Sequence, residues 1–189
     1  LNGSGYRLGP AIDRWVDPTN PPANSMNTEL ASSEGHVKVA VKVTDNGNGT
    51  WTYQYAVMNL DFSRAVVQGA PAGSGEDPRV VSNRGFNAFS VPLQSGATIS
   101  TAKFSNGEVS QNDNWNFTNS NGTLMWSATP QGIFSNSWAA RGKPTLDWGT
   151  LYSFSFVAST GPVTGNASLR VAQSGTPASY SVATLIPSS

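Results

Sequence analysis

The chain has 189 residues, among them no cysteine and one histidine, and charged side chains make up 12% of the sequence. This composition excludes disulfides, thiolate catalysis and cysteine-ligated metal sites, and one histidine is too few for the usual zinc, copper or haem centres. Eleven basic residues balance eleven acidic ones, so no net charge attracts nucleic acid. We therefore expect neither a cofactor nor a nucleic-acid partner.

Neutral polar residues replace the missing charges, with 25 serines, 16 threonines and 17 asparagines. This composition and the absence of cysteine favour an exported bacterial protein that is secreted, held at the cell surface or periplasmic. No apolar run approaches the roughly 18 residues that a membrane-spanning helix needs, so we expect no membrane span. The chain starts at Leu1 with no basic segment before an apolar one, which fits a removed signal peptide or a piece of a longer precursor.

Residues 1–35 are rich in proline, asparagine, serine and glycine and show neither helical nor strand periodicity. They predict an extended N-terminal arm in front of a single β-domain at residues 36–189. Four large side chains interrupt the arm, namely Tyr6, Leu8, Ile12 and Trp15. Because large apolar residues are usually covered, we expect the arm to dock, either on its own domain or on a partner.

Residues 37–59 carry the strongest local pattern in the chain. Every second residue of segment 37–43 is valine, which indicates a half-buried strand, and the asparagines and glycines of 46–49 favour a tight turn. Residues 51–59 return as a second strand, so the pattern predicts a β-hairpin. We expect its tyrosines to face the core; the alternative places them outside, beside Lys38 and Lys42.

Seven more segments have the alternation or the flanking turns of short strands. They are residues 86–93, 97–105, 115–118, 123–128, 151–159, 167–172 and 179–186. We predict an all-β fold with very little helix, in which about nine strands form an antiparallel two-sheet sandwich with Greek-key or jelly-roll-like links. Residues 68–84 and 129–145 are long for hairpin turns, and we expect function to lie there.

Groups that could carry catalysis are few. His36 starts a strand and no G-x-S-x-G motif accompanies it, so we expect no catalytic residue of the serine-hydrolase type. A glycan hydrolase that uses paired carboxylates stays an alternative, with Glu29, Asp61 and Asp147 as the acids near aromatic residues. Segment 45–50 resembles the start of a calcium loop but lacks the later carboxylate, so we predict no metal site there.

Six tryptophans raise a second alternative, a carbohydrate-binding module, because indole rings stack on sugar rings. Trp115 and Trp138 are the best candidates, since both stand beside polar residues and Trp138 lies in a long loop. We expect Trp51, Trp126 and Trp148 to pack in the core or at a sheet edge, next to predicted strands.

Several segments together resemble a domain of exported bacterial proteins whose function is uncharacterised. They are KVAVKVTDNGNGTWTYQYAVMN, FSVPL, the hairpin through Trp115 and Trp126, and DWGTLYSFSFVAS with GPVTG, and they cover about residues 36–186. The resemblance implies no active site. In such proteins more chain can precede a segment like LNGSGYRLGP, which implies a partner segment from the same precursor.

These patterns together predict a non-catalytic, exported structural or interaction module of a bacterial surface or extracellular assembly. Its expected partner is another protein chain or a segment of the same precursor, with a glycan as the alternative.

Overall fold

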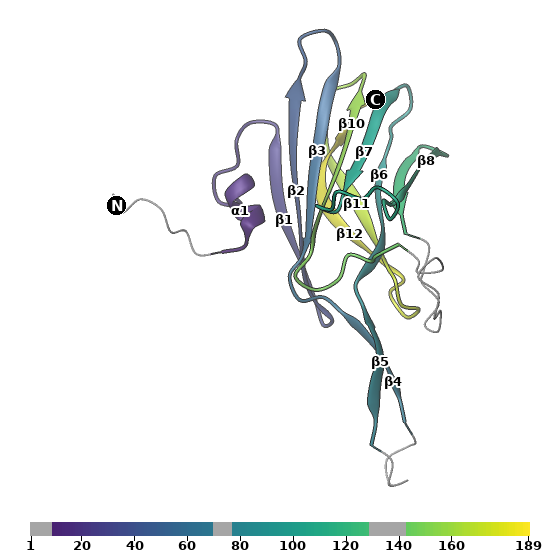
Figure 1. The fold of residues 1–189 in the computed structure, drawn as a ribbon. Coiled ribbons are helices and arrows are strands. Elements are labelled where there is room, and N and C mark those ends of the chain that lie inside the picture. The colour runs from purple at the N-terminus through teal and green to yellow at the C-terminus, as the bar shows by residue number, and fades with distance from the viewer. Residues whose placement is uncertain (1–8, 70–76, 129–142) are drawn as a thin grey trace.

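The computed structural model describes residues 9–69, 77–128 and 143–189. Ten of the twelve strands in these residues build two antiparallel five-stranded sheets that pack face to face, and the other two form a separate ribbon (Figure 1). Sheet I has the order β1-β2-β3-β10-β7 and sheet II the order β12-β11-β6-β9-β8. In sheet I the strands are β1 (Ser25–Ser32), β2 (Gly35–Asp45), β3 (Trp51–Asn59), β10 (Leu151–Ala158) and β7 (Ile99–Ser105). In sheet II they are β12 (Ser179–Pro187), β11 (Pro162–Val171), β6 (Phe86–Pro92), β9 (Thr123–Ser127) and β8 (Asn116–Ser120). The predicted two-sheet sandwich is confirmed.

Aromatic side chains fill the space between the sheets. Because alternate residues of a strand point to opposite faces, the aromatic residues of β3 and β10 gather on one side of sheet I. Phe154 lies 4.7 Å from Phe89 of sheet II, measured between ring centroids, and Tyr53 stacks on Phe156 at 5.0 Å. Such ring pairs contribute about 0.5 to 1.5 kcal/mol beyond the area they bury. The core therefore joins the two sheets through the inner face of sheet I.

The hairpin predicted at residues 37–59 forms β2 and β3. Gly47 and Gly49 adopt φ angles of 73° and 78°, a conformation that glycine reaches without a steric penalty. The register pairs Val41 with Tyr55 across the two strands, which places the tyrosine on the valine face. The prediction that the tyrosines face inward is thus confirmed.

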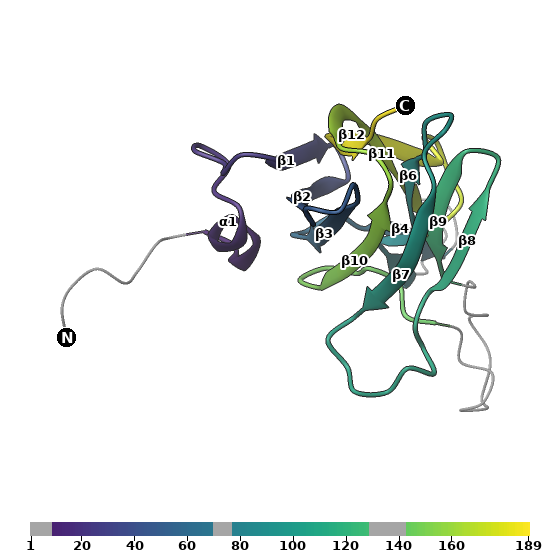
Figure 2. The same cartoon turned by 90° about the horizontal axis from the view of Figure 1, so that it is seen from above.

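The predicted arm at residues 1–35 is wrong over much of its length. Segment 25–32 is β1, an edge strand that pairs with β2, and α1 (Ala11–Trp15) is a single helical turn. All residues of the edge strand β1 are half-buried or exposed. Its sequence therefore lacks the alternation of apolar and polar residues that predicts a strand. Tyr6 and Leu8 lie outside the described residues. Seen from above, α1 lies on the outer side of β2 and β3, away from sheet II (Figure 2).

Residues 68–84 do not form a plain loop. Most of β4 (Arg64–Gln68) precedes this segment and β5 (Arg79–Arg84) closes it, and the two strands pair as a ribbon that projects beyond the sandwich (Figure 1). The ribbon has no core of its own, so its sequence carries no burial pattern that could predict it. With β1, it raises the strand number from the predicted nine to twelve among the described residues. Residues 129–142 of the second predicted loop lie outside them.

A buried ion pair fixes the base of this ribbon. Arg64 donates from Nε to Glu34 Oε1 at 2.5 Å and from Nη2 to Glu34 Oε2 at 2.6 Å, and the Tyr180 hydroxyl donates to Glu34 Oε2 at 2.8 Å. The hydrogen bonds from Arg64 hold the pKa of Glu34 below its ordinary value. The three residues join the β1–β2 turn of sheet I to β12 of sheet II.

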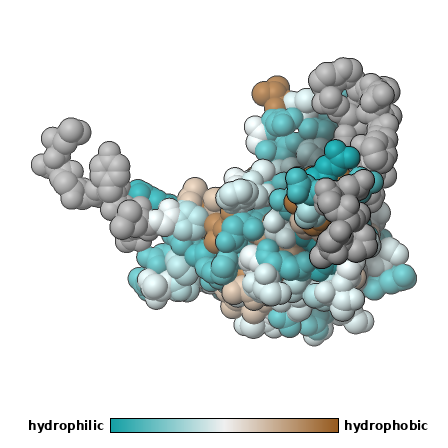
Figure 3. Space-filling model, turned by 90° about the horizontal axis from the view of Figure 1, so that it is seen from below, coloured by the Kyte–Doolittle hydropathy of each residue, from teal (hydrophilic) through white to brown (hydrophobic). Residues whose placement is uncertain are grey.

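Seen from below, the coloured surface is mainly hydrophilic or intermediate in hydropathy, and its hydrophobic residues form small, separate patches (Figure 3). In the part of the chain that the structure describes, no helix is long and apolar enough to cross a membrane.

Candidate functional site: a groove on the outer face of sheet I

The outer face of sheet I carries small and polar side chains where the inner face carries aromatic ones. On β10, Tyr152, Phe154 and Phe156 are buried, while Ser153 is exposed and Ser155 is half-buried. Sheet pairing aligns the outward residues in rows across the strands. One row contains Ala56 of β3, Ser153 of β10 and Ser105 of β7, and the next contains Gln54, Ser155 and Lys103. These rows form a shallow polar floor.

Helix α1 covers one end of this face. Ile12 and Val16 of the α1 region pack on Ala40 and Ala56, and all four residues are buried. The alanine side chains are short, which lets the helix approach the strands closely. The position of α1 explains why the predicted docking residues Ile12 and Trp15 lie against their own domain.

Polar contacts hold α1 in place. Lys38 Nζ donates to both carboxylate oxygens of Asp13 at 2.8 Å, and Asn27 Nδ2 donates to Asp13 Oδ1 at 2.9 Å and to the Val16 carbonyl at 2.7 Å. The Lys38 side chain is 9% exposed and that of Asp13 21%, so water screens this ion pair only weakly. Glu29 Oε2 lies 3.5 Å from the same ammonium group. The charge of Lys38 is therefore balanced within the protein.

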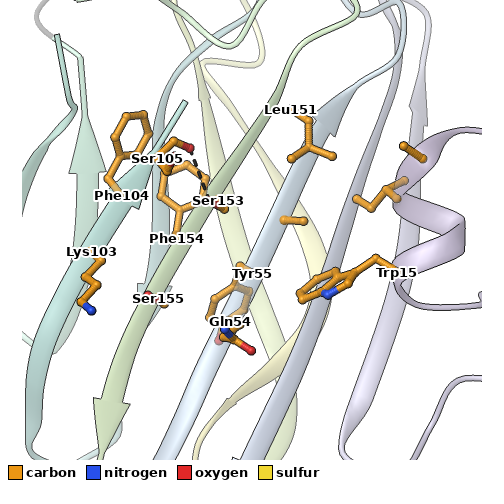
Figure 4. Close-up of a pocket in the computed structure, with 13 residues that line it drawn as sticks. Trp15, Gln54, Tyr55, Lys103, Phe104, Ser105, Leu151, Ser153, Phe154 and Ser155 are labelled. Carbon is orange, nitrogen blue, oxygen red and sulfur yellow. Dashed lines mark hydrogen bonds between the residues drawn. The ribbon is translucent and has the colours of Figure 1, made fainter. Parts of the chain in front are cut away.

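Between α1 and β7 the face is hollowed into a groove of about 550 Å³ (Figure 4). Trp15 stands on the α1 side and Lys103 on the β7 side, with Gln54, Ser153 and Ser155 between them. Tyr55, Phe104 and Phe154 also line it, but their rings lie behind the strands, so their backbones face the groove. The groove runs across the sheet rather than along one strand.

Several polar groups in the groove have no partner of their own. Among the described residues, no hydrogen bond or ion pair is found for the side chains of Gln54, Lys103 and Ser155. The Ser153 hydroxyl makes one long hydrogen bond, at 3.5 Å, to the Ser105 carbonyl (Figure 4). Lys42 places its Nζ 5.1 Å from the centroid of Trp15, beside the groove. The side chains of Gln54, Ser155 and Lys103 can therefore bind a ligand without breaking any hydrogen bond or ion pair found among the described residues.

The carboxylates considered for hydrolysis contact groups of the protein itself. Asp61 Oδ1 accepts a hydrogen bond from the His36 backbone N–H at 2.5 Å and lies 2.9 Å from His36 Nδ1. The backbone hydrogen bond lowers the pKa of Asp61. Asp147 accepts hydrogen bonds from the Gly85 N–H and the Thr145 hydroxyl, both at 2.7 Å, in the turn before β10. Asp61 thus ties the end of β3 to the start of β2, and Asp147 ties the turn before β10 to the start of β6.

The predicted sugar platform does not form at Trp115. This residue is 4% exposed, stacks on Phe104 at 5.6 Å between ring centroids, and donates from Nε1 to the Pro144 carbonyl at 2.8 Å. Its burial leaves almost no ring surface for a sugar. Trp138, the other predicted platform residue, lies outside the described residues. Trp126 is buried as expected, whereas Trp148 is 71% exposed, so the expectation that Trp148 packs in the core or at an edge is wrong.

The residues that shape the groove were missed because their sequence signal is ordinary. Serines that alternate with aromatics in the YSFSF segment predict a solvated face, and the same pattern results whether that face is open or hollowed. The groove depends on the pairing of β3, β10 and β7, which lie far apart in the chain.

No protein-family model, curated protein or solved structure matches the chain. Within residues 9–69, 77–128 and 143–189, no group of three or more histidine, aspartate or glutamate residues is placed to hold a metal ion.

Proposed function

We propose that the protein is a non-catalytic binding module of an exported bacterial surface or extracellular assembly, and that it binds its partner through the groove on sheet I. The observation that carries the proposal is the groove itself, a hollow in the outer face of sheet I. Its Gln54, Ser155 and Lys103 side chains have no hydrogen-bond or ion-pair partner among the residues that the structure describes. Polar groups left without partners beside a cavity are the usual means by which a site orients its ligand.

The use of the acidic groups supports binding rather than catalysis. General acid–base catalysis needs a titratable group within reach of a substrate, and a glycosidase needs two carboxyl groups that face each other across the bond to be cleaved. Asp13, Asp61 and Asp147 instead accept short hydrogen bonds from neighbouring protein groups. The described residues that line the groove include no carboxylate.

Export and bacterial origin are supported by composition. The chain has no cysteine, little charge and many neutral polar residues, a combination that suits an extracellular bacterial environment. A partner chain or a segment of the same precursor, expected from the sequence, remains a prediction.

Nuclear magnetic resonance titration of the 15N-labelled protein tests this function. The probes are short oligomers of three kinds, namely galacturonate oligosaccharides, maltose oligosaccharides of the same length and glutamate oligopeptides. We expect at least one probe to shift the backbone amide signals of Gln54, Ser153 and Ser155, while the signal of Arg79 on the β4–β5 ribbon stays in place.

Two results would contradict the proposal. One is that amide shifts from all three probes map outside the groove or do not occur. The other is turnover of an oligosaccharide by the purified protein that is lost in Asp61→Asn or Asp147→Asn while the unfolding transition stays native.

A further inference from the structure

We propose that the ligand of this groove is an acidic glycan, a chain of sugars that carry carboxylate groups, bound across the floor between Lys42 and Lys103. The inference rests on the proposed binding function of the same groove and adds the chemical class of its ligand.

Among the described residues that line the groove, Lys103 is the only charged one, and Lys42 lies beside the groove next to Trp15. Lys42, Gln54, Ser155 and Lys103 occupy one row of directly paired residues that crosses β2, β3, β10 and β7. Neighbouring strands are about 4.8 Å apart, so the row spans about 14 Å between its two lysine backbones. Asp13 and Glu29 neutralise Lys38, but no such partner is found for Lys103 in the described part of the chain. A positive charge thus stands at each end of the row, which favours an anionic ligand.

The floor between the lysines suits a ligand with many hydroxyl groups. Serine hydroxyls both donate and accept hydrogen bonds, and the Gln54 amide does the same with separate atoms. Ser153, Ser155 and Ser105 repeat this chemistry along the groove. The half-buried Trp15 ring and the exposed Leu151 side chain supply apolar surface for the C–H faces of sugar rings. The neutral hydrogen-bonding groups of the floor suit the hydroxyls of a sugar chain, and the two lysines suit its carboxylates.

A peptide suits the groove less well. A peptide that adds as a strand would pair with the edge strand β7 at one end of the groove. It would not lie across the floor, because β3 and β10 at the centre are paired on both sides. An amphipathic helix would bring apolar side chains onto Ser153 and Ser155 and leave their hydroxyls without partners. A long nucleic acid is disfavoured by the balanced net charge of the chain.

Isothermal titration calorimetry with the three oligomers named above tests the ligand class. We expect galacturonate oligosaccharides to bind at least tenfold more tightly than maltose oligosaccharides or glutamate oligopeptides of matched length, and to bind more weakly as salt is added. Lys103→Gln removes one exposed charge contact and should lower the galacturonate affinity about two- to fivefold. Arg79→Gln is the matched control: it removes the same charge from the exposed β4–β5 ribbon and should leave the affinity unchanged.

Each other outcome overturns the inference. Equal or tighter binding of maltose oligosaccharides assigns the groove to neutral glycans, and tighter binding of glutamate oligopeptides assigns it to acidic peptides. In both cases the proposed binding function survives if the amide shifts map to the groove. If Lys103→Gln leaves the galacturonate affinity unchanged, or Arg79→Gln lowers it equally, Lys103 does not bind the carboxylates of the ligand in this groove. Absence of binding by all three probes rejects the inference and the proposed function together.

Discussion

The two faces of β10 differ sharply in burial. Phe154 is 1% exposed and contacts rings of both sheets, whereas Ser153, the preceding residue, is exposed in the groove. Alternate side chains of β10 therefore have different roles. One set packs between the two sheets, and the other set is exposed to solvent. Substitutions on the outer face should therefore change binding while the free energy of unfolding stays nearly constant.

Truncation of the inner face gives the largest expected effect. Phe154→Ala removes a buried ring from between the sheets and should lower the free energy of unfolding by about 3 to 5 kcal/mol, because apolar contacts are lost and a cavity is left. The control Ser153→Ala should change it by less than about 0.5 kcal/mol. Urea unfolding followed by tryptophan fluorescence measures both. Similar losses in the two variants would abolish the contrast between the faces.

The ion pair that links the sheets at the base of the ribbon should give a smaller effect. Glu34→Gln leaves the 8% exposed Arg64 side chain without its anionic partner and should cost about 2 to 3 kcal/mol. The expected loss is smaller than for a fully buried ion pair, because the Glu34 side chain is 23% exposed.

Glu34 also predicts a pH dependence. Its folded pKa lies below the ordinary 4.5, so its contribution is complete above pH 4.5 and is lost as the pH falls through the lowered folded pKa. Unfolding measured from pH 7 downward should therefore show a steeper loss of stability in the wild type than in Glu34→Gln. Parallel curves for the two proteins would show that this pair does not contribute to acid stability.

Much of the fold could be predicted because burial on one face leaves a period of two in the sequence. The valines of β2 and the aromatics of β10 carry that period, and both strands form where it indicates. The sequence did not predict β1, β4 and β5. An edge strand and a projecting ribbon bury too few side chains to leave a period of two in the sequence. The site was predicted less well: Ile12 and Trp15 were expected to dock, but the groove beside them arises from strand pairing that no local pattern encodes.

The most direct test of the separate roles of the two faces is a substitution that fills the groove and leaves the core unchanged. Ser153→Trp places a large side chain on the groove floor, and Ser181→Trp places the same side chain at an exposed position of β12 in sheet II. Binding of the tightest of the three oligomers and the free energy of unfolding are measured for both variants. We predict that Ser153→Trp lowers the affinity at least tenfold, that Ser181→Trp does not, and that both proteins unfold within about 1 kcal/mol of the wild type. Unchanged affinity in a folded Ser153→Trp protein would contradict the assignment of binding to the outer face of sheet I.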